Sequence, residues 1–244
     1  MKPPRILVTN DDGIDSPGIY ALWEAMSKVG TPIVIAPSTE QSAASHSITL
    51  NKPLFINYIS RDHGFEGWSV DGTPADCTKV GINEVLKHRP DLIISGINCG
   101  ANLGVDLIYS GTLSAAAEGA LLGIPSIAIS LASFKTDDFR ASKIVAIEIA
   151  EHVLKNKMPK GTLLNVNVPY ADPKDIKGKL ITRQGSQYFM DEFEKRIDPR
   201  ENTYYWIKGK KVDNDNSIEY DGKAIQNNYI SITPIRFDLT DELY

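Results

Sequence analysis

Cysteine and histidine are scarce in this sequence, which limits the kinds of site that it can build. Its 244 residues include two cysteines and four histidines, and no two histidines lie four positions apart. Two cysteines are too few for the disulfide framework of a small secreted domain, and no Cys/His cluster has the spacing of a zinc site. We therefore expect neither a disulfide scaffold nor a zinc centre, and we interpret each histidine as an ordinary surface or core residue.

Long apolar runs are also missing. The longest uncharged stretch, residues 119–134, contains Pro125 and three serines, and it is shorter than the roughly 18 apolar residues that a membrane-spanning helix needs. Residues 1–4 lead directly into a strand pattern, without the apolar segment of an export signal. We therefore expect a soluble, cytoplasmic protein that has no membrane partner.

Positive charge is slightly outnumbered. The chain has 26 Lys and Arg against 31 Asp and Glu, a net charge of −5 that is spread along the sequence. Binding to a nucleic-acid backbone needs a broad basic face, so polymeric DNA or RNA is not an expected partner. We interpret the one tight basic cluster, residues 208–211, as a solvated turn rather than as a contact for phosphate.

Short apolar runs alternate with helical patterns in most of the chain. A first helix is expected from Pro17 to just before Gly30, because apolar residues recur there at helical spacing. Further strands are expected at residues 5–9, 32–36, 91–95, 126–130 and 163–168, and further helices at residues 76–86, 112–122 and 138–155. This alternation predicts an α/β fold with a mainly parallel sheet and right-handed crossovers.

Two stretches depart from the alternation. Residues 48–70 look β-like, and residues 181–207 are polar, aromatic and poor in helical periodicity, which favours extended hairpins that form an arm. The sequence predicts one domain over residues 1–244, since 42% hydrophobic residues suffice for a core at this length. Its core is expected at about residues 1–180 and 228–236, and the β arm and C-terminal extension at about 181–227 and 237–244.

Three predicted loops carry residues suited to chemistry, and all follow strands at the edge where an open α/β sheet binds ligands. In the first, Asp11 and Asp12 follow the strand at 5–9. Adjacent carboxylates repel each other unless a cation or a proton lies between them, so the pair suggests a metal site. The alternative is an ordinary Asx turn that caps the next helix.

The second loop, residues 37–47, is rich in serine and includes Ser42. Small hydroxyl groups can ligate a hard cation or bind phosphate, although most serine-rich loops are only loops. The third loop is rich in glycine from Ser95 to Gly104, and Thr112 follows at the expected start of a helix. Backbone N–H groups in such a loop, with a helix N-terminus beside them, form a site for an anion such as phosphate. The alternative is a flexible loop with Thr112 as a plain N-cap.

Taken together, the three loops offer only oxygen ligands beside an anion site. Carboxylate, hydroxyl and amide oxygens favour Mg²⁺ or Mn²⁺ over zinc or copper. A hard metal beside an anion site indicates hydrolysis of a phosphoester.

At these residues the sequence resembles the SurE survival proteins, a family of metal-dependent nucleoside monophosphate phosphatases. The resemblance runs in the family's order from residue 5 to about residue 240. It rests on the segments 6–13, 16–19, 36–37, 41–49, 72–77, 95–98, 109–112, 165–169, 198–200, 205–206 and 231–234, and on Gly100, Asn102, Leu103 and Gly104.

The resemblance implies roles for particular residues. One divalent cation, Mg²⁺ or Mn²⁺, would be held by Asp11, Asp12, Ser42 and Asn98, and the two aspartates would be catalytic. The phosphate group would be contacted by Asn98, Asn102, Ser110, Gly111 and Thr112.

The resemblance also implies a Rossmann-like core with helices on both faces of the sheet, a protruding β-hairpin arm, and a C-terminal segment exchanged between subunits. A homodimer or homotetramer is expected, because the aromatic stretch 188–206 would expose too much apolar area if it projected alone. Two features depart from the family pattern: Ala43 replaces a common glycine, and the chain reaches Tyr244 soon after residue 241.

The sequence thus predicts a phosphomonoesterase that hydrolyses nucleoside 5'- and 3'-monophosphates, with short polyphosphate as a further substrate. One alternative is a phospho-acceptor signalling domain, which also places an acidic pair after its first strand. Such a domain needs about half this length and an acceptor Asp where this chain has Asn98. A second alternative is a nucleotide-binding protein without turnover, which the intact acidic pair disfavours.

Overall fold

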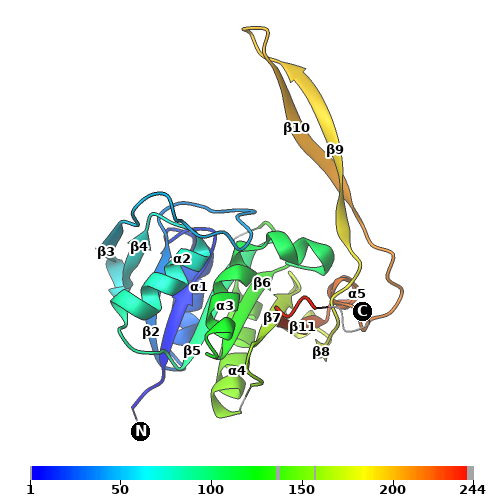
Figure 1. Ribbon diagram of the computed structural model, residues 1–244. Coiled ribbons are helices and arrows are strands. Elements are labelled where there is room, and N and C mark those ends of the chain that lie inside the picture. Colours follow the sequence, from blue (N-terminus) through cyan, green and yellow to red (C-terminus); the bar gives the residue numbers. More distant parts are fainter. Residues whose placement is uncertain (1, 136–137, 157, 241–244) are drawn as a thin grey trace.

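The computed structural model describes residues 2–135, 138–156 and 158–240, and its centre is one nine-stranded sheet (Figure 1). The spatial order of the strands is β3-β4-β2-β1-β5-β6-β7-β11-β8. All neighbours are parallel except β3–β4 and β7–β11. The strands are β1 (Arg5–Thr9), β2 (Thr31–Pro37), β3 (Ile56–Ser60), β4 (Glu66–Val70), β5 (Leu92–Cys99), β6 (Ser126–Leu131), β7 (Thr162–Val168), β8 (Lys179–Ile181) and β11 (Ile230–Arg236).

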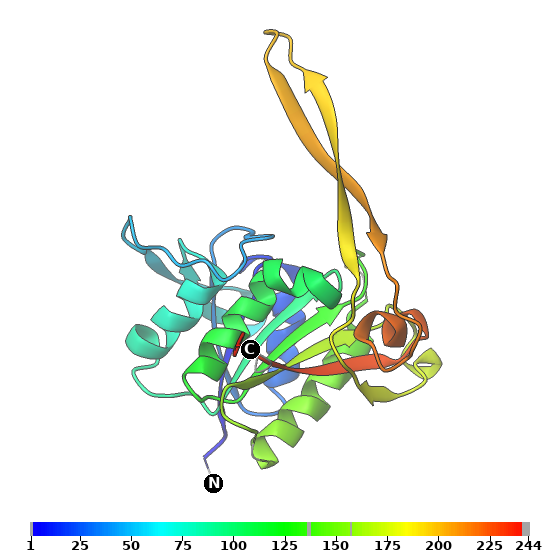
Figure 2. The same ribbon diagram turned by 45° about the vertical axis from the view of Figure 1, so that its right-hand side comes forward.

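Helices cover both faces of this sheet (Figures 1 and 2). Successive side chains of a strand point to opposite faces, and accordingly Ile6 and Val8 of β1 join one apolar core while Leu7 joins the other. The first core is covered by α1 (Pro17–Met26) and α4 (Arg140–Lys155), and the other face by α2 (Pro74–Val80) and α3 (Gly111–Leu121). The predicted α/β class with a mainly parallel sheet is confirmed.

Shorter helical segments complete the body. A π-helical turn, η2 (Gly81–Val85), continues α2, so helical structure runs from residue 74 to 85 where the sequence predicts a helix at 76–86. The remaining short segments are η1 (Asp62–Gly64), η3 (Gly104–Tyr109), η4 (Pro173–Asp175) and α5 (Asp221–Gln226). No helix in these described ranges is long and apolar enough to cross a bilayer.

The first helix packs unusually closely on the sheet. Pro17 is its first residue, as the sequence predicts, and Ser16 is its N-cap. A Cβ atom added at Gly18 would lie 2.0 Å from the carbonyl oxygen of Ile97 in β5. Only a glycine permits this approach, and it brings the start of α1 against the end of β5, where Asn98 lies.

The strand order reverses at β1. The chain runs from β1 through α1 to β2 on one side, and later returns to place β5 on the other side of β1. In open α/β sheets a ligand binds beyond the carboxyl ends of the strands at such a reversal. Asp11 and Asp12 follow β1, and Asn98 lies at the end of β5, so the candidate residues flank the reversal.

A long two-stranded hairpin projects from the body (Figures 1 and 2). This arm consists of β9 (Tyr188–Ile197) and β10 (Thr203–Val212), paired antiparallel. Residues 208–211 belong to β10, so their interpretation as a turn is wrong: Lys208 and Lys210 pair with Glu192 and Met190 across the hairpin. The exposed large apolar residues of the arm are Tyr188, Phe189, Phe193, Ile197, Tyr204, Tyr205, Trp206 and Ile207.

Two other predicted segments differ from the observed ones. Within the β-like stretch 48–70, strands form only at 56–60 and 66–70, and residues 48–55 instead form a loop without regular structure. Of the predicted C-terminal extension, residues 237–240 have no regular structure, and residues 241–244 lie outside the described part of the chain.

Candidate active site

A cavity of about 650 Å³ lies at the reversal of strand order. Its walls come from the loops after β1, β2, β5 and β6 and from η3, so chain segments far apart in sequence share it. Five of its lining residues are acidic: Asp11, Asp12, Asp15, Glu40 and Asp106. No Lys, Arg or His lines it within the described residues, so a phosphate group would meet only negative side-chain charge there.

The turn after β1 is held by Asn10, which is fully buried. Its Nδ2 donates to the carbonyl oxygen of Gly13 at 2.9 Å and to Ser16 Oγ at 2.8 Å. The Asx-type turn considered above is therefore made by Asn10, and Ser16 caps α1. Since neither task falls to Asp11 or Asp12, both carboxylates are available at the cavity.

Asp11 is buried against the first turn of α3. Thr112 Oγ1 donates to Asp11 Oδ1 at 2.6 Å, and a Cβ atom added at Gly111 would lie 2.7 Å from the Asp11 Cβ. Glycine at position 111 thus lets the carboxylate reach the positive end of the helix. Burial nevertheless raises the pKa of Asp11 above its usual value, and the hydrogen bond from Thr112 offsets this only in part.

Asp12 is half-buried beside it. The backbone N–H of Cys99 donates to Asp12 Oδ2 at 3.3 Å. Burial, followed by the charge of Asp11, raises the pKa of Asp12 to about 6. Two adjacent carboxylates resist ionisation when no protein group balances their negative charge, and such a pair is typical of a cation-binding site.

Cys99 also lines the cavity, yet its thiol has the wrong character for a nucleophile. Burial raises its pKa to about 11, and the charges of Asp12 and Asp11 add to the effect. Reactive thiols have lowered pKa values. The part of Cys99 that serves the site is its backbone N–H.

Ser42 stands in an exposed loop whose backbone is tied to the site. The N–H of Gln41 donates to the carbonyl oxygen of Asp11 at 2.7 Å, and Ser45 donates to the carbonyl oxygens of Tyr109 (through N, 3.1 Å) and Ile108 (through Oγ, 2.7 Å). The Ser42 hydroxyl donates to Glu40 Oε1 at 2.5 Å, which keeps its lone pairs available. The second predicted loop therefore does share the cavity.

A buried acidic residue on α3 anchors the far end of this loop. Glu118, 6% exposed, lies 2.8 Å from His46 Nε2 and 2.8 Å from Lys79 Nζ. Burial raises the pKa of Glu118, but the hydrogen bonds from His46 and Lys79 outweigh it, and the pKa lies below its usual value. This role of His46 differs from the ordinary one that the sequence predicts, because nothing in the local pattern links His46 to position 118.

Asn98 and Asn102 are fixed by different partners. Asn98 Nδ2 donates to the carbonyl oxygen of Gly100 at 2.7 Å, which turns its Oδ1 away from that donor side. Asn102 Nδ2 donates to Ser130 Oγ at 2.9 Å. The Asn102 backbone is gripped by two buried asparagines of β7: its N–H donates to Asn167 Oδ1 at 2.8 Å, and its carbonyl oxygen accepts from Asn165 and Asn167 at 2.9 Å each.

The start of α3 divides into a part that faces the cavity and a part behind it. Ser110 lines the cavity and is the N-cap of α3, accepting a hydrogen bond from the N–H of Leu113 at 3.0 Å. Thr112 is therefore not the N-cap, and its fully buried hydroxyl is taken up by Asp11. The side chain of Thr112 thus contacts an aspartate in place of the cavity.

These side chains fit a hard cation. Asp11 and Asp12 each place one carboxylate oxygen on a protein partner and keep the other, Asn98 uses its Nδ2 and keeps its Oδ1, and Ser42 adds a hydroxyl. Nowhere in the described ranges do three or more His, Cys, Asp or Glu side chains form a metal-binding group. The neutral oxygens of Ser42 and Asn98 are therefore needed to complete an all-oxygen donor set of the kind that Mg²⁺ or Mn²⁺ prefers.

Comparison with known proteins gives a concordant result. The family model described as survival protein SurE matches residues 6–191. The chain belongs to the SurE family. The 5'-nucleotidase SurE of Thermosipho africanus is 47% identical over 240 residues, which cover 98% of this chain and 94% of the relative. That of Syntrophus aciditrophicus is 45% identical over 237 residues, covering 97% and 89%.

The similarity extends to three dimensions. The crystal structure of the SurE protein from Aquifex aeolicus superposes with a TM-score of 0.85 at 42% identity, covering 98% of this chain and 95% of that one. Within this SurE fold, Ala43 has a φ of 55°. The replacement of a common glycine noted in the sequence therefore occurs in left-handed backbone, where a side chain is strained.

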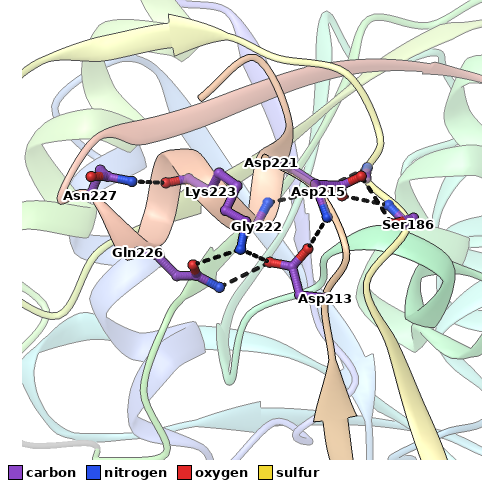
Figure 3. A network of polar contacts seen from close by, with 9 residues as sticks. Ser186, Asp213, Asp215, Asp221, Gly222, Lys223, Gln226 and Asn227 are labelled. Carbon is purple, nitrogen blue, oxygen red and sulfur yellow. Dashed lines mark hydrogen bonds and ion pairs between the residues drawn. The ribbon is translucent and has the colours of Figure 1, made fainter. Parts of the chain in front are cut away.

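Three aspartates of this SurE chain organise the base of the arm (Figure 3). Asp215 accepts hydrogen bonds from Ser186 N–H at 2.7 Å and Ser186 Oγ at 2.9 Å, which ties the segment after β10 to the segment before β9. Asp213 pairs with Lys223 Nζ at 3.0 Å and accepts from Gln226 Nε2 at 3.0 Å. The two strands of the arm are thus joined where they leave the body.

Asp221 connects this base to the loop that leads into η3. It is fully buried and accepts from the N–H groups of Gly104 at 2.9 Å, Gly185 at 3.0 Å and Gly222 at 2.7 Å. Burial raises the pKa of Asp221, and these three N–H donors only partly offset it. The carbonyl oxygen of Gln187 also accepts from the Val105 N–H at 2.8 Å. The arm therefore starts directly beside a wall of the cavity.

Proposed function

We propose that the chain is a metal-dependent phosphomonoesterase, a 5'-nucleotidase that hydrolyses nucleoside 5'- and 3'-monophosphates to nucleoside and phosphate. This proposal rests on the lining of the cavity: five of the lining residues are acidic and, among the described residues, none of them is basic. A phosphate anion can enter such a cavity only if a cation reverses its charge. The names of the relatives as 5'-nucleotidases support the substrate class.

Asp11, Asp12, Ser42 and Asn98 would hold one Mg²⁺ or Mn²⁺ ion, the two aspartates supplying the charge and the other two neutral oxygens. When bound, such an ion lowers the pKa of a coordinated water and neutralises charge on the phosphoryl group. The chain's part is to fix the ligands: Thr112 orients Asp11, the Cys99 N–H orients Asp12, and Gly100 orients the amide of Asn98.

The phosphate group would lie between Asn98 and Asn102 on one side and the start of α3 on the other. Asn98, Asn102 and Ser110 line the cavity. The Thr112 hydroxyl is bound to Asp11 and is not free for the phosphate. Gly111 and Thr112 would therefore contribute through the N-terminus of α3, which favours an anion. Asp11 and Asp12 are the candidates for moving a proton to or from the attacking water.

The arm carries the exposed apolar surface from which we infer an assembly of copies of this chain. Its apolar and aromatic side chains are exposed along both strands, an area that a lone chain would leave in water. We propose that the arm packs on another subunit in a homodimer or homotetramer.

A phosphate-release screen tests the function. Purified protein is incubated with nucleoside 5'- and 3'-monophosphates, short polyphosphate and sugar phosphates, with Mg²⁺ or Mn²⁺ and with EDTA. Repeated turnover of nucleoside monophosphates that EDTA abolishes is expected. Stoichiometric phosphate retained on the protein would instead indicate a phospho-acceptor domain, and binding without release would indicate a nucleotide-binding protein.

A further inference from the structure

A large apolar side chain, Phe134, is strongly exposed on the wall of the cavity. Phe134 is 83% exposed, lies in the segment directly after β6, and lines the cavity that contains Asp11 and Asp12. Isolated apolar residues are common on protein surfaces. Phe134 differs because it lines a concave acidic site, where an exposed aromatic ring provides an apolar surface for a ligand.

The ring is held against the third loop. A Cβ atom added at Gly100 would lie 2.8 Å from Phe134 Cε1 and 3.2 Å from its Cζ, so the ring rests on the bare backbone of that glycine. Gly100 has a φ of 116°, and its N–H donates to the carbonyl oxygen of Leu131 at 3.0 Å. The same strand end therefore fixes both the glycine and the start of the segment that carries Phe134.

The contact places the ring close to the proposed metal ligands. Gly100 directly follows Cys99, whose N–H donates to Asp12, and its carbonyl oxygen holds the amide of Asn98. A second exposed aromatic residue, Tyr109, is 56% exposed, lines the same cavity and immediately precedes Ser110. The cavity thus has a polar, acidic interior and two aromatic side chains on its wall.

A nucleoside monophosphate also has a polar part and an apolar part, which match the polar interior and the aromatic wall of this cavity. Its phosphate requires the polar end, whereas its base presents a flat apolar face that stacks on aromatic rings whatever the base. A sugar phosphate or a polyphosphate has no such face. We propose that Phe134, with Tyr109 beside the phosphate end, forms the platform on which the nucleobase of the substrate stacks; this rests on the proposed nucleotidase function and says how that site distinguishes nucleotides from other phosphate esters.

The test compares substrates with and without a base. Phe134→Ala is assayed with AMP and with ribose 5-phosphate, beside Phe134→Trp, which keeps an aromatic face, and Phe55→Ala, a matched loss of a 63% exposed Phe away from the cavity. Stacking energies predict that Phe134→Ala raises the KM for AMP about 5- to 100-fold. In Phe134→Ala, the kcat for AMP and the KM for ribose 5-phosphate should stay near wild type. Phe55→Ala should keep the wild-type kcat and KM, and Phe134→Trp should bind AMP like wild type.

Two results would overturn the platform. An unchanged KM for AMP in Phe134→Ala, or an equal loss with both substrates, would mean that the ring does not contact the base. Calorimetric binding of AMP in the presence of Ca²⁺ to wild type and Phe134→Ala gives the same comparison without turnover. If the wild type binds AMP through Phe134 but releases no phosphate, the platform stands and the proposed activity fails.

Discussion

The Thr112 hydroxyl donates to Asp11 Oδ1 at 2.6 Å, and both side chains are buried. This contact joins the turn after β1 to the second residue of α3, so the helix whose N-terminus we propose to bind the phosphate also orients one of the two adjacent carboxylates. The position of a proposed metal ligand therefore depends on a residue that the family resemblance assigns to phosphate.

Thr112→Val should test this dependence. The variant keeps the shape of the side chain but removes the donor, so Asp11 loses its orientation and one hydrogen bond to a charged group, worth about 1.5–3 kcal/mol. We expect kcat to fall about tenfold or more, at 1.4 kcal/mol per factor of ten. Thr112→Ser, which keeps the hydroxyl, should restore most of the rate. Equal activity of the Val and Ser variants in a phosphate-release assay would exclude the orienting role.

Changing Asp11 or Asp12 to Asn should separate activity from stability. Each change removes a full ligand charge at nearly constant size, so turnover should fall by about 100-fold or more if both residues hold the metal. At pH 7 the metal-free variants should be more stable than wild type by about 1 kcal/mol, because one of two repelling carboxylates is gone.

Melting temperatures with EDTA and with Mn²⁺ measure this second effect. Wild type should gain from Mn²⁺, and Asp11→Asn and Asp12→Asn should gain much less. Near-normal turnover in both variants would mean that the metal site is misplaced.

Ala43→Gly should stabilise the protein. Ala43 has a φ of 55°, a region that costs an L-residue about 1–2 kcal/mol, whereas glycine adopts it freely at an entropic cost of about 0.5–1 kcal/mol. The expected net gain in the free energy of unfolding is about 0.5 kcal/mol. Urea unfolding measures it, and Ala44→Gly, in a neighbouring residue without positive φ, should lose stability. A loss in both variants would show that position 43 is not strained.

Glu118 should give the stability a defined dependence on pH. Its pKa is lowered in the folded state from 4.5, so the stabilisation is fully present above that value and is lost as the pH falls through the lower, folded-state pKa. At pH 7, Glu118→Gln should destabilise the protein by about 1–3 kcal/mol. The difference from wild type should shrink on acidification.

Thermal melts of Glu118→Gln across the acid range check this prediction. The exposed Glu151→Gln on α4 is the matched control and should differ little from wild type at any pH. A loss of stability in Glu118→Gln that grew towards acid pH would contradict a lowered pKa of Glu118 in the folded protein.

The arm should make the protein oligomeric in solution. Light scattering at micromolar concentration is expected to give a mass of two or four chains, not the 26.9 kDa of one. Replacing Trp206 and Phe193, 57% and 65% exposed, by Ser should lower that mass, since the arm would lose part of its apolar surface. A 26.9 kDa wild-type particle would refute the assembly.

Local patterns predicted the central strands of the sheet, because these strands are buried on both faces and read as short apolar runs, such as residues 5–9 and 126–130. They also predicted which loops meet, since the carboxyl ends of parallel strands share one edge. The basic residues 208–211 were misjudged as a turn, because a strand in a projecting hairpin has no buried face to impose alternation.

Contacts between distant segments left no such local signal. Three such contacts join residues more than 30 positions apart: Glu118 binds His46, Asn165 and Asn167 bind the backbone of Asn102, and Phe134 packs on Gly100. The one available hint was the pair of asparagines in an otherwise apolar strand, because polar side chains are rarely buried there without a partner.

The order of strands at the sheet edge sets the order in which the molecule can be completed. β8 pairs only with β11 among the named strands, and the whole arm lies between these two in the chain. During synthesis from the N-terminus, β9 and β10 therefore leave the ribosome before the strand that closes the sheet. The hairpin, with its exposed apolar side chains, is thus synthesised while the sheet still lacks β11. In a circular permutant opened at the tip of the arm, β11 would instead be synthesised before the hairpin is complete.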